Sequence, residues 1–115
     1  MSRRSRKKAS RISQAFAPVF AALGDETRLA LVAALCGGQP RSIAQLTGGS
    51  RLTRQAITKH LRVLQRARIV RNVRTGRENR FEFLPEPLDE LKKYLERVSE
   101  QWDQALSRLK TFVEG

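Results

Sequence analysis

The sequence predicts a single small domain that is mainly α-helical and carries one β-hairpin. Apolar residues recur at helical spacing along most of the chain. Residues 69–83 differ, because they are rich in branched and aromatic residues around one central glycine. The length of 115 residues suits one domain with one modest core. Cys36 is the single cysteine, which excludes an internal disulfide framework.

The chain is strongly basic, and its charge is unevenly placed. It holds 23 Lys and Arg against 11 Asp and Glu, a net charge of +12 at pH 7. Residues 86–115 carry a net charge of −2, so residues 1–85 hold +14. A polyanion is the natural partner, nucleic acid before a membrane. No apolar run approaches the roughly 20 residues needed to span a bilayer, and no signal-peptide pattern follows the basic start. We therefore expect a cytoplasmic protein without a membrane partner.

Residues 1–14 are expected to form a disordered basic arm ahead of a domain at residues 15–115. Residues 1–11 contain six bases and no acid, with almost nothing apolar to bury. Such an arm either adds phosphate and minor-groove contacts on DNA or is a mobile terminus with weak nonspecific attraction. The sequence leaves both alternatives open.

Three helices are expected before the most basic one. Residues 16–23 form a short apolar segment with Pro18 near its start, and it needs cover from the C-terminal helix or from a partner chain. Asp25 is expected to cap a second helix that stops at the glycine pair of residues 37–38, with Cys36 as a small core residue near its end. Ser42 is expected to cap a third helix at residues 43–47.

Residues 53–65 predict an amphipathic helix with one apolar and one basic face. Ile57, Leu61 and Leu64 share a stripe that can be buried, and Thr53 is a candidate N-cap. The other face has no acid and is rich in groups that donate to base edges and phosphates: Arg54, Gln55, Thr58, Lys59 and Arg62. A short helix, a glycine turn and a longer basic helix form a helix-turn-helix, whose second helix enters the major groove of DNA.

A basic hairpin is expected directly after this helix. Two strands, at residues 69–74 and 79–83, enclose a turn at residues 75–78. Four arginines line it: Arg71, Arg74, Arg77 and Arg80. A basic hairpin beside a recognition helix is typical of the wing of a winged helix-turn-helix, here with the element order α-α-α-α-β-β-α, and its arginines suit the minor groove or the DNA backbone. An ordinary solvated hairpin is the alternative.

The last helix, at about residues 86–113, carries a heptad pattern. Its apolar residues are spaced alternately by three and four: Leu88, Leu91, Leu95, Val98, Trp102, Ala105, Leu109 and Phe112, with Leu106 and Val113 beside them. The stretch from Leu88 to Phe112 is about 35–40 Å long as a helix, more than one small domain needs. Part of the stripe is expected to cover the first helix of its own chain and part to meet a second copy. A purely intramolecular helix is the alternative.

The element order and four motifs resemble the ArsR-type winged-helix transcriptional regulators. Residues 22–29 (ALGDETRL) are similar to the family's A-L-x-D-P-T-R-L, with Glu26 in place of proline. Residues 57–64 (ITKHLRVL) are similar to V-S-x-H-L-K-V-L. Residues 67–70 (ARIV) stand where A-G-L-V is usual, and residues 74–77 (RTGR) where the wing carries R-x-G-R. The resemblance covers roughly residues 16–113.

The resemblance implies a homodimeric regulator, a repressor, that binds a partly palindromic operator in double-stranded DNA. It implies base contacts from Arg54, Gln55, Thr58 and Lys59. It implies contacts with phosphates or the minor groove from Arg41, Ser42, Arg62, Arg74, Arg77 and Arg80. It also implies dimerisation through the first and last helices, with interface residues Phe16, Phe20, Leu91, Leu95, Val98, Trp102, Leu106 and Leu109.

Metal sensing, which is common in the family, is not expected here. Known members use thiols on the helix before the recognition helix, or Asp and His ligands on the last helix. The third helix here has no thiol, and the last helix has neither His nor Cys. We therefore expect no metal and no cofactor, and the inducer stays open. His60 is expected to be structural.

Two other functions are kept as alternatives. One is a metal- or redox-responsive regulator that uses Cys36, and the other is a winged-helix module that binds protein. An enzyme is not expected, because the sequence shows no nucleophile–base pair and no ligand set.

Overall fold

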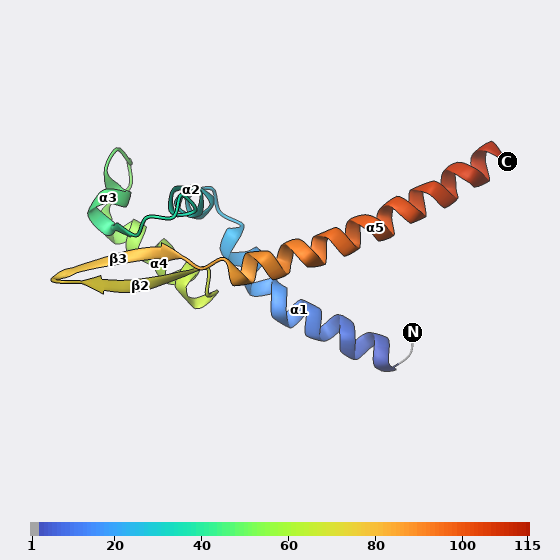
Figure 1. Ribbon diagram of the computed structural model, residues 1–115, viewed down its shortest axis with the longest axis horizontal. Helices are drawn as coiled ribbons and strands as arrows, with labels where there is room; N and C mark the ends of the chain where they lie inside the picture. The colour runs from blue at the N-terminus through green and yellow to red at the C-terminus, as the bar shows by residue number, and fades with distance from the viewer. Residues whose placement is uncertain (1–2) are drawn as a thin grey trace.

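The computed structural model describes the backbone of residues 3–115 and the side chains of residue 11 and residues 14–115. Figure 1 shows a body with the hairpin at one end, from which the first and last helices extend on the other side. The elements in chain order are α1 (Arg3–Leu23), α2 (Glu26–Leu35), β1 (Arg41–Ser42), α3 (Ile43–Thr47), α4 (Arg54–Arg66), β2 (Val70–Thr75), β3 (Glu78–Phe83) and α5 (Glu86–Glu114). The mainly helical winged helix-turn-helix expected from the sequence is confirmed.

The sheet has three antiparallel strands in the order β1-β3-β2, one more than the expected hairpin. The β2–β3 register pairs Thr75 with Glu78, which leaves a two-residue turn in which Gly76 has φ 64°. Glycine at the first central position is what a tight hairpin turn of this kind requires. The added strand β1 pairs with β3 through Arg41 and Ser42. Two residues are too short to show an alternating pattern, so sequence reasoning missed this strand.

The core is built around the apolar face of α4. Ile57, Leu61 and Leu64 are buried, as their spacing predicted. Ile69 and Val70, at the start of the hairpin, complete this centre and are also fully buried. Burial of this apolar face fixes the orientation of α4, so the opposite, polar face points outward.

All three predicted helix caps are present. The side chain of Asp25 accepts from the backbone N–H of Arg28 at 3.0 Å. The hydroxyl of Ser42 accepts from Gln45 N–H at 3.1 Å, and the Gln45 side chain accepts in return from Ser42 N–H at 2.9 Å. This pair is a capping box. The hydroxyl of Thr53 accepts from the backbone N–H of Ala56 at 3.1 Å, which defines the start of α4.

Helix α1 is longer than the expected segment of residues 16–23. It includes residues 3–14, for which we predicted a disordered arm, and Pro18 lies inside the helix rather than near its start. Residues 2–17 contain no Pro or Gly and include several Arg, Lys and Ala residues, all good helix formers. Pro18 removes one backbone donor without ending the helix. Apart from Arg11, the DNA contacts expected of the arm concern side chains outside the described residues. These contacts and the division at residue 14 stay predictions.

Two apolar side chains occupy positions other than those expected. Cys36 is exposed rather than part of the core, because Leu35 takes the buried position at the end of α2. Leu91, expected at a dimer interface, is only 5% exposed and belongs to the core of its own chain. The boundary between inward and outward parts of α5 therefore lies after Leu91.

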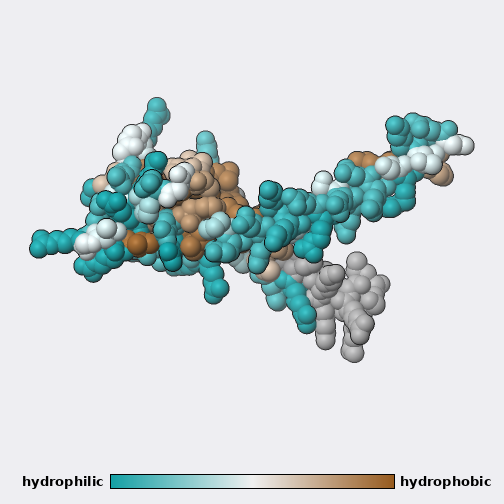
Figure 2. All heavy atoms as spheres, in the orientation of Figure 1, coloured by the Kyte–Doolittle hydropathy of each residue, from teal (hydrophilic) through white to brown (hydrophobic). Residues whose placement is uncertain are grey.

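Helix α5 packs on its own chain only through its first part. The ring of Phe16 on α1 stacks on Tyr94, with centroids 4.9 Å apart and planes at 20°. Farther along, Leu95, Trp102, Leu106, Leu109, Phe112 and Val113 are exposed. Figure 2 shows apolar residues on the outer part of α5, separate from those of the body. The outer half of α5 thus has an apolar stripe that its own chain does not cover.

The end of α4 carries a residue in an unfavourable backbone conformation. Arg68 has φ 61°, the one positive φ at a non-glycine residue in the described chain. Its N–H donates to Gln65 O at 3.0 Å, and Ile69 N–H donates to Leu64 O at 3.0 Å. These two bonds form a Schellman motif, in which glycine usually occupies the left-handed position.

We expect Arg68→Gly to stabilise the protein. Glycine adopts this conformation without steric cost, although it is more flexible in the unfolded chain. The expected gain in free energy of unfolding is about 0.5–1 kcal/mol, measured by urea denaturation at fixed protein concentration. Gly76→Ala is the matched control. It adds a Cβ at φ 64°, where no neighbouring atom lies within 4 Å, so strain alone should lower the stability. A destabilised Arg68→Gly variant would contradict this account.

Candidate nucleic-acid interface

The outward face of α4 presents the four predicted base-reading residues together. Arg54, Gln55 and Lys59 are exposed and Thr58 is half-buried. With Arg62 they line one shallow depression of about 490 Å³ along the helix. The hydroxyl of Thr58 donates to the backbone carbonyl of Arg54 at 2.7 Å. Its proton is therefore used within the helix, so Thr58 offers a methyl group and acceptor lone pairs rather than a free donor.

The wing lies beside this helix and shares a second depression with it. That hollow, of about 440 Å³, is lined by the start of α3, by Arg54 and Thr58 of α4, and by Arg77 and Glu78 of the hairpin. The charge of Glu78 is balanced by Arg80, which donates to it. The arrangement places a wing-tip arginine next to the face predicted to read bases. Asn79 lines the same hollow, and sequence reasoning missed it. Its side-chain amide can both donate and accept, and its place next to the predicted turn was the available signal.

The four wing arginines are not equivalent. Arg71 pairs with Glu82, and Arg80 donates to Glu78 at 3.0 and 3.1 Å. Arg74 donates only to the backbone carbonyl of Gly76, at 3.3 Å. Among the described residues, Arg77 has no side-chain hydrogen bond or ion pair. The charges of Arg71 and Arg80 are partly neutralised by these acids, whereas those of Arg74 and Arg77 remain available to phosphates.

The two predicted phosphate contacts at the start of α3 differ in exposure. Arg41 is exposed on β1. Ser42 is only 4% exposed, and its hydroxyl caps α3. Its hydroxyl is therefore already used within the fold, and a phosphate contact at Ser42 stays a prediction. Its position in β1, paired with Arg80 of β3, turns the side chain inward.

A hydrogen-bonded cluster anchors α4 to α1 and α2. The guanidinium of Arg28 donates to the carbonyls of Ala22 at 2.6 Å and Ala21 at 3.3 Å, at the end of α1. Its third nitrogen lies 3.2 Å from Nδ1 of His60 on α4. Because arginine can only donate, this contact requires an unprotonated Nδ1. His60 is therefore structural, as expected.

Asp25 completes this cluster. Its carboxylate lies 3.8 Å from Nδ1 of His60. The backbone N–H of Arg28 donates to this carboxylate and, helped by the charge of the Arg28 side chain, lowers the pKa of Asp25 below its ordinary value. The carboxylate thus stays ionised at neutral pH and caps the start of α2, which carries Arg28 into contact with His60.

Comparisons of the sequence and the fold with known proteins identify the family of this chain. The signature of a helix-turn-helix domain family matches residues 23–73. An ArsR-like transcriptional regulator from Rhodococcus sp. RHA1 is 38% identical, with a TM-score of 0.80 over 90% of this chain and 94% of that one. The chain belongs to the ArsR family of transcriptional regulators. No curated protein matched the sequence significantly.

More distant solved structures share the fold. The transcriptional repressor BigR from Xylella fastidiosa is 21% identical, with a TM-score of 0.60 over 85% of this chain and 96% of that one. NolR from Sinorhizobium fredii is 20% identical, with a TM-score of 0.62 over 89% of this chain and 94% of that one. The family resemblance expected from the sequence is confirmed, and this ArsR-family protein is a DNA-binding transcriptional regulator, a class of protein distinct from enzymes.

Two further features of this ArsR-family protein concern metals and membranes. Within the described part of the chain, no three His, Cys, Asp or Glu side chains come together as a metal site. None of the described helices has the length and apolar character that crossing a bilayer requires.

Proposed function

We propose that the protein is a homodimer that represses transcription by occupying a partly palindromic operator. The observation that carries this proposal is the shared hollow between α4 and the wing, which brings Arg54 and Arg77 together on one basic surface. The elements of this surface lie within residues 1–85, where the net charge is +14. A groove-reading helix beside a basic hairpin suits contact with both the major groove and the neighbouring backbone.

Side-chain chemistry indicates which residues of this surface contact bases and which contact phosphates. Gln55 can make a bidentate contact with adenine, and Arg54 or Lys59 can contact the acceptor edge of guanine. Thr58 offers a methyl group suited to thymine. Arg41, Arg62, Arg74 and Arg77 supply charge for phosphates, so affinity should fall as salt rises.

The dimer is supported by the uncovered stripe of α5. Trp102 is 64% exposed and Leu106 is 56% exposed in the single chain. These side chains recur on one face of a 29-residue helix, which is about 43 Å long. A second copy would bury the same residues on both chains, as a two-fold interface requires. We place Leu95, Val98, Trp102, Leu106 and Leu109 in this interface, together with Phe20, which is exposed on α1.

A protein-binding role for α4 is less well supported. A protein interface normally has an apolar centre, whereas the outward face of α4 presents Arg54, Gln55, Lys59 and Arg62. Repression as the mode of action agrees with the relative BigR, a transcriptional repressor.

Selection of bound duplexes from a random DNA pool tests the proposal. We expect enrichment of one site with two inversely repeated halves. Their centres should lie about one helical turn, or a multiple of it, apart, so that two copies of α4 meet the same side of the duplex. Enrichment of a single unrepeated half-site would refute binding as a dimer, and no enrichment at low salt would refute sequence-specific binding. Transcription from a promoter that overlaps the selected site should then fall when the protein is added.

A further inference from the structure

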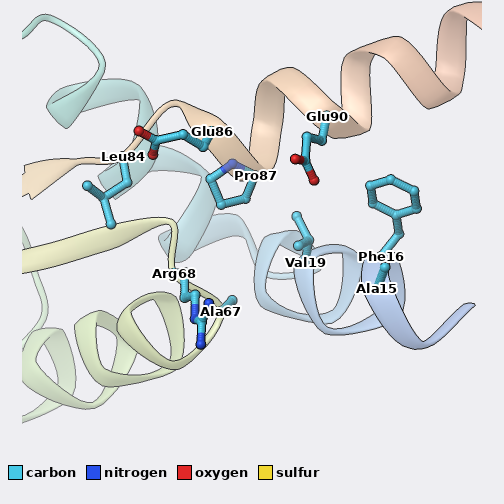
Figure 3. A pocket seen from close by; sticks show the side chains of 9 residues that line it. All are labelled: Ala15, Phe16, Val19, Ala67, Arg68, Leu84, Glu86, Pro87 and Glu90. Carbon is cyan, nitrogen blue, oxygen red and sulfur yellow. The ribbon is translucent and has the colours of Figure 1, made fainter. Parts of the chain in front are cut away.

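A cavity of about 460 Å³ lies between α1, the start of α5 and the connection from α4 to β2 (Figure 3). Its volume lies within the range of small-molecule sites, about 300–1,000 Å³. None of its lining residues belongs to the surface proposed to face DNA. The cavity is formed entirely by one chain, so it needs no partner copy to exist.

One side of the cavity is apolar and firmly held. Phe16 and Val19 of α1 face Pro87 and Glu90 of α5 across the space (Figure 3). Val19 is only 5% exposed, and Phe16 is fixed by its stacking on Tyr94. Leu84 adds a further apolar wall. A wall of this kind is suited to a flat or compact apolar body.

The charged groups around this apolar wall are two acids and one base. Glu86 and Glu90 stand one turn apart on α5, and Arg68 lies on the opposite side of the space (Figure 3). Among the described residues, none of the three takes part in an ion pair. The helix dipole favours acids in the first turn of a helix. This stabilises Glu86, whereas Glu90 lies beyond the first turn of α5.

Like charges four residues apart on a helix repel each other. The side chains of Glu86 and Glu90 are both exposed, so solvent weakens this repulsion, and a bound cation would remove what remains of it. An anion would meet two carboxylates against one guanidinium. The charge of the lining thus selects a cation, and the apolar wall selects an organic one.

We propose that this cavity binds a small organic cation, with an ammonium group at Glu90, an apolar body against Phe16 and Val19, and Glu86 adding negative charge at the rim. The probe is tryptamine, which carries an indole and an ammonium group. Tryptophol and indole-3-propionate have the same ring system with a neutral and an anionic end. Each ligand is titrated into the full chain without DNA, and amide shifts are followed by ¹H–¹⁵N NMR. The result is thus independent of whether the protein binds DNA.

We expect tryptamine to shift amides around the cavity, with indole-3-propionate binding at least about fivefold more weakly. Replacing both acids, Glu86→Gln with Glu90→Gln, should weaken tryptamine binding by about fivefold or more. Asp89→Asn is the matched control, because Asp89 is an exposed acid on the same turn that does not line the cavity; its affinity should stay within about twofold. Ala15→Phe, which fills the cavity from its exposed rim, should abolish binding.

Three results would overturn the proposal. One is equal affinity for the three ligands, which would show that charge does not select. The second is unchanged tryptamine binding in the double glutamine variant or in Ala15→Phe. The third is a set of shifted amides confined to residues 95–113, which would show that the indole ring binds the exposed stripe of α5 instead.

Discussion

Replacing Trp102 and Leu106 together by glutamate should give a monomer that binds operator DNA at least about 100-fold more weakly. Both side chains are exposed in the single chain, so the fold of the body does not depend on them. In a dimer they would be buried, and two carboxylates placed there would be desolvated without a partner. A monomer loses the second half-site contact, whose effective concentration typically contributes a factor of about 10²–10⁴.

The oligomeric state should be measured by sedimentation and operator affinity by fluorescence anisotropy at one salt concentration. The matched control is Gln104→Glu with Ser107→Glu, which adds the same charge on the opposite side of the helix. It should stay dimeric and bind nearly as well as the unmodified protein. A dimeric Trp102/Leu106 variant would show that the stripe is not the interface. A monomeric variant with full affinity would show that one chain is sufficient for operator binding.

Leu91 lies on the same stripe and should behave differently. It is buried in the core of its own chain, so its loss would destabilise the fold rather than separate the subunits. The heptad spacing treats Leu91 and Leu95 alike, because it records only the face of the helix on which they lie. Where α5 leaves the body depends on α1, whose Phe16 stacks on Tyr94. The sequence therefore predicted the stripe, but not the point at which it changes partner.

Local patterns predicted the recognition helix well. Thr53 is its N-cap, and Ile57, Leu61 and Leu64 form its buried side. Each of these features depends on residues within a few positions of one another, where spacing and capping chemistry determine the structure. The exposure of Arg54, Gln55 and Lys59 follows directly from the burial of the opposite side.

Long-range contacts explain the features that were missed. Strand β1 exists only because residues 41–42 meet β3, about 40 residues later in the chain. In the same strand Ser42 is buried, although its role as the cap of α3 follows from the local sequence. The partners of the wing arginines could have been found earlier. The turn at Gly76 sets a register that places Arg71 opposite Glu82, and this predicts their ion pair.

Gln55→Ala and Lys59→Ala should relax sequence preference, whereas Arg77→Ala should weaken binding to all sequences. A side chain that reads a base contributes about 1–3 kcal/mol on the preferred site and little on a scrambled duplex. Arg77, at the wing tip without an acidic partner among the described residues, should instead contact the backbone. Its loss should lower affinity for both duplexes by a similar factor. It should also reduce the slope of log affinity against log salt concentration by about one.

Affinities for the preferred and scrambled duplexes, each measured over a series of salt concentrations, separate these two roles. Lys93→Ala controls for the loss of one positive charge, because Lys93 is exposed on α5, away from the hollow shared by α4 and the wing. It should change neither the preference nor the affinity by more than about twofold. Equal losses on the two duplexes in the Gln55 and Lys59 variants would show that these side chains hold the backbone instead. Sequence choice would then depend on Arg54 and Thr58, or on the shape of the DNA that the wing contacts.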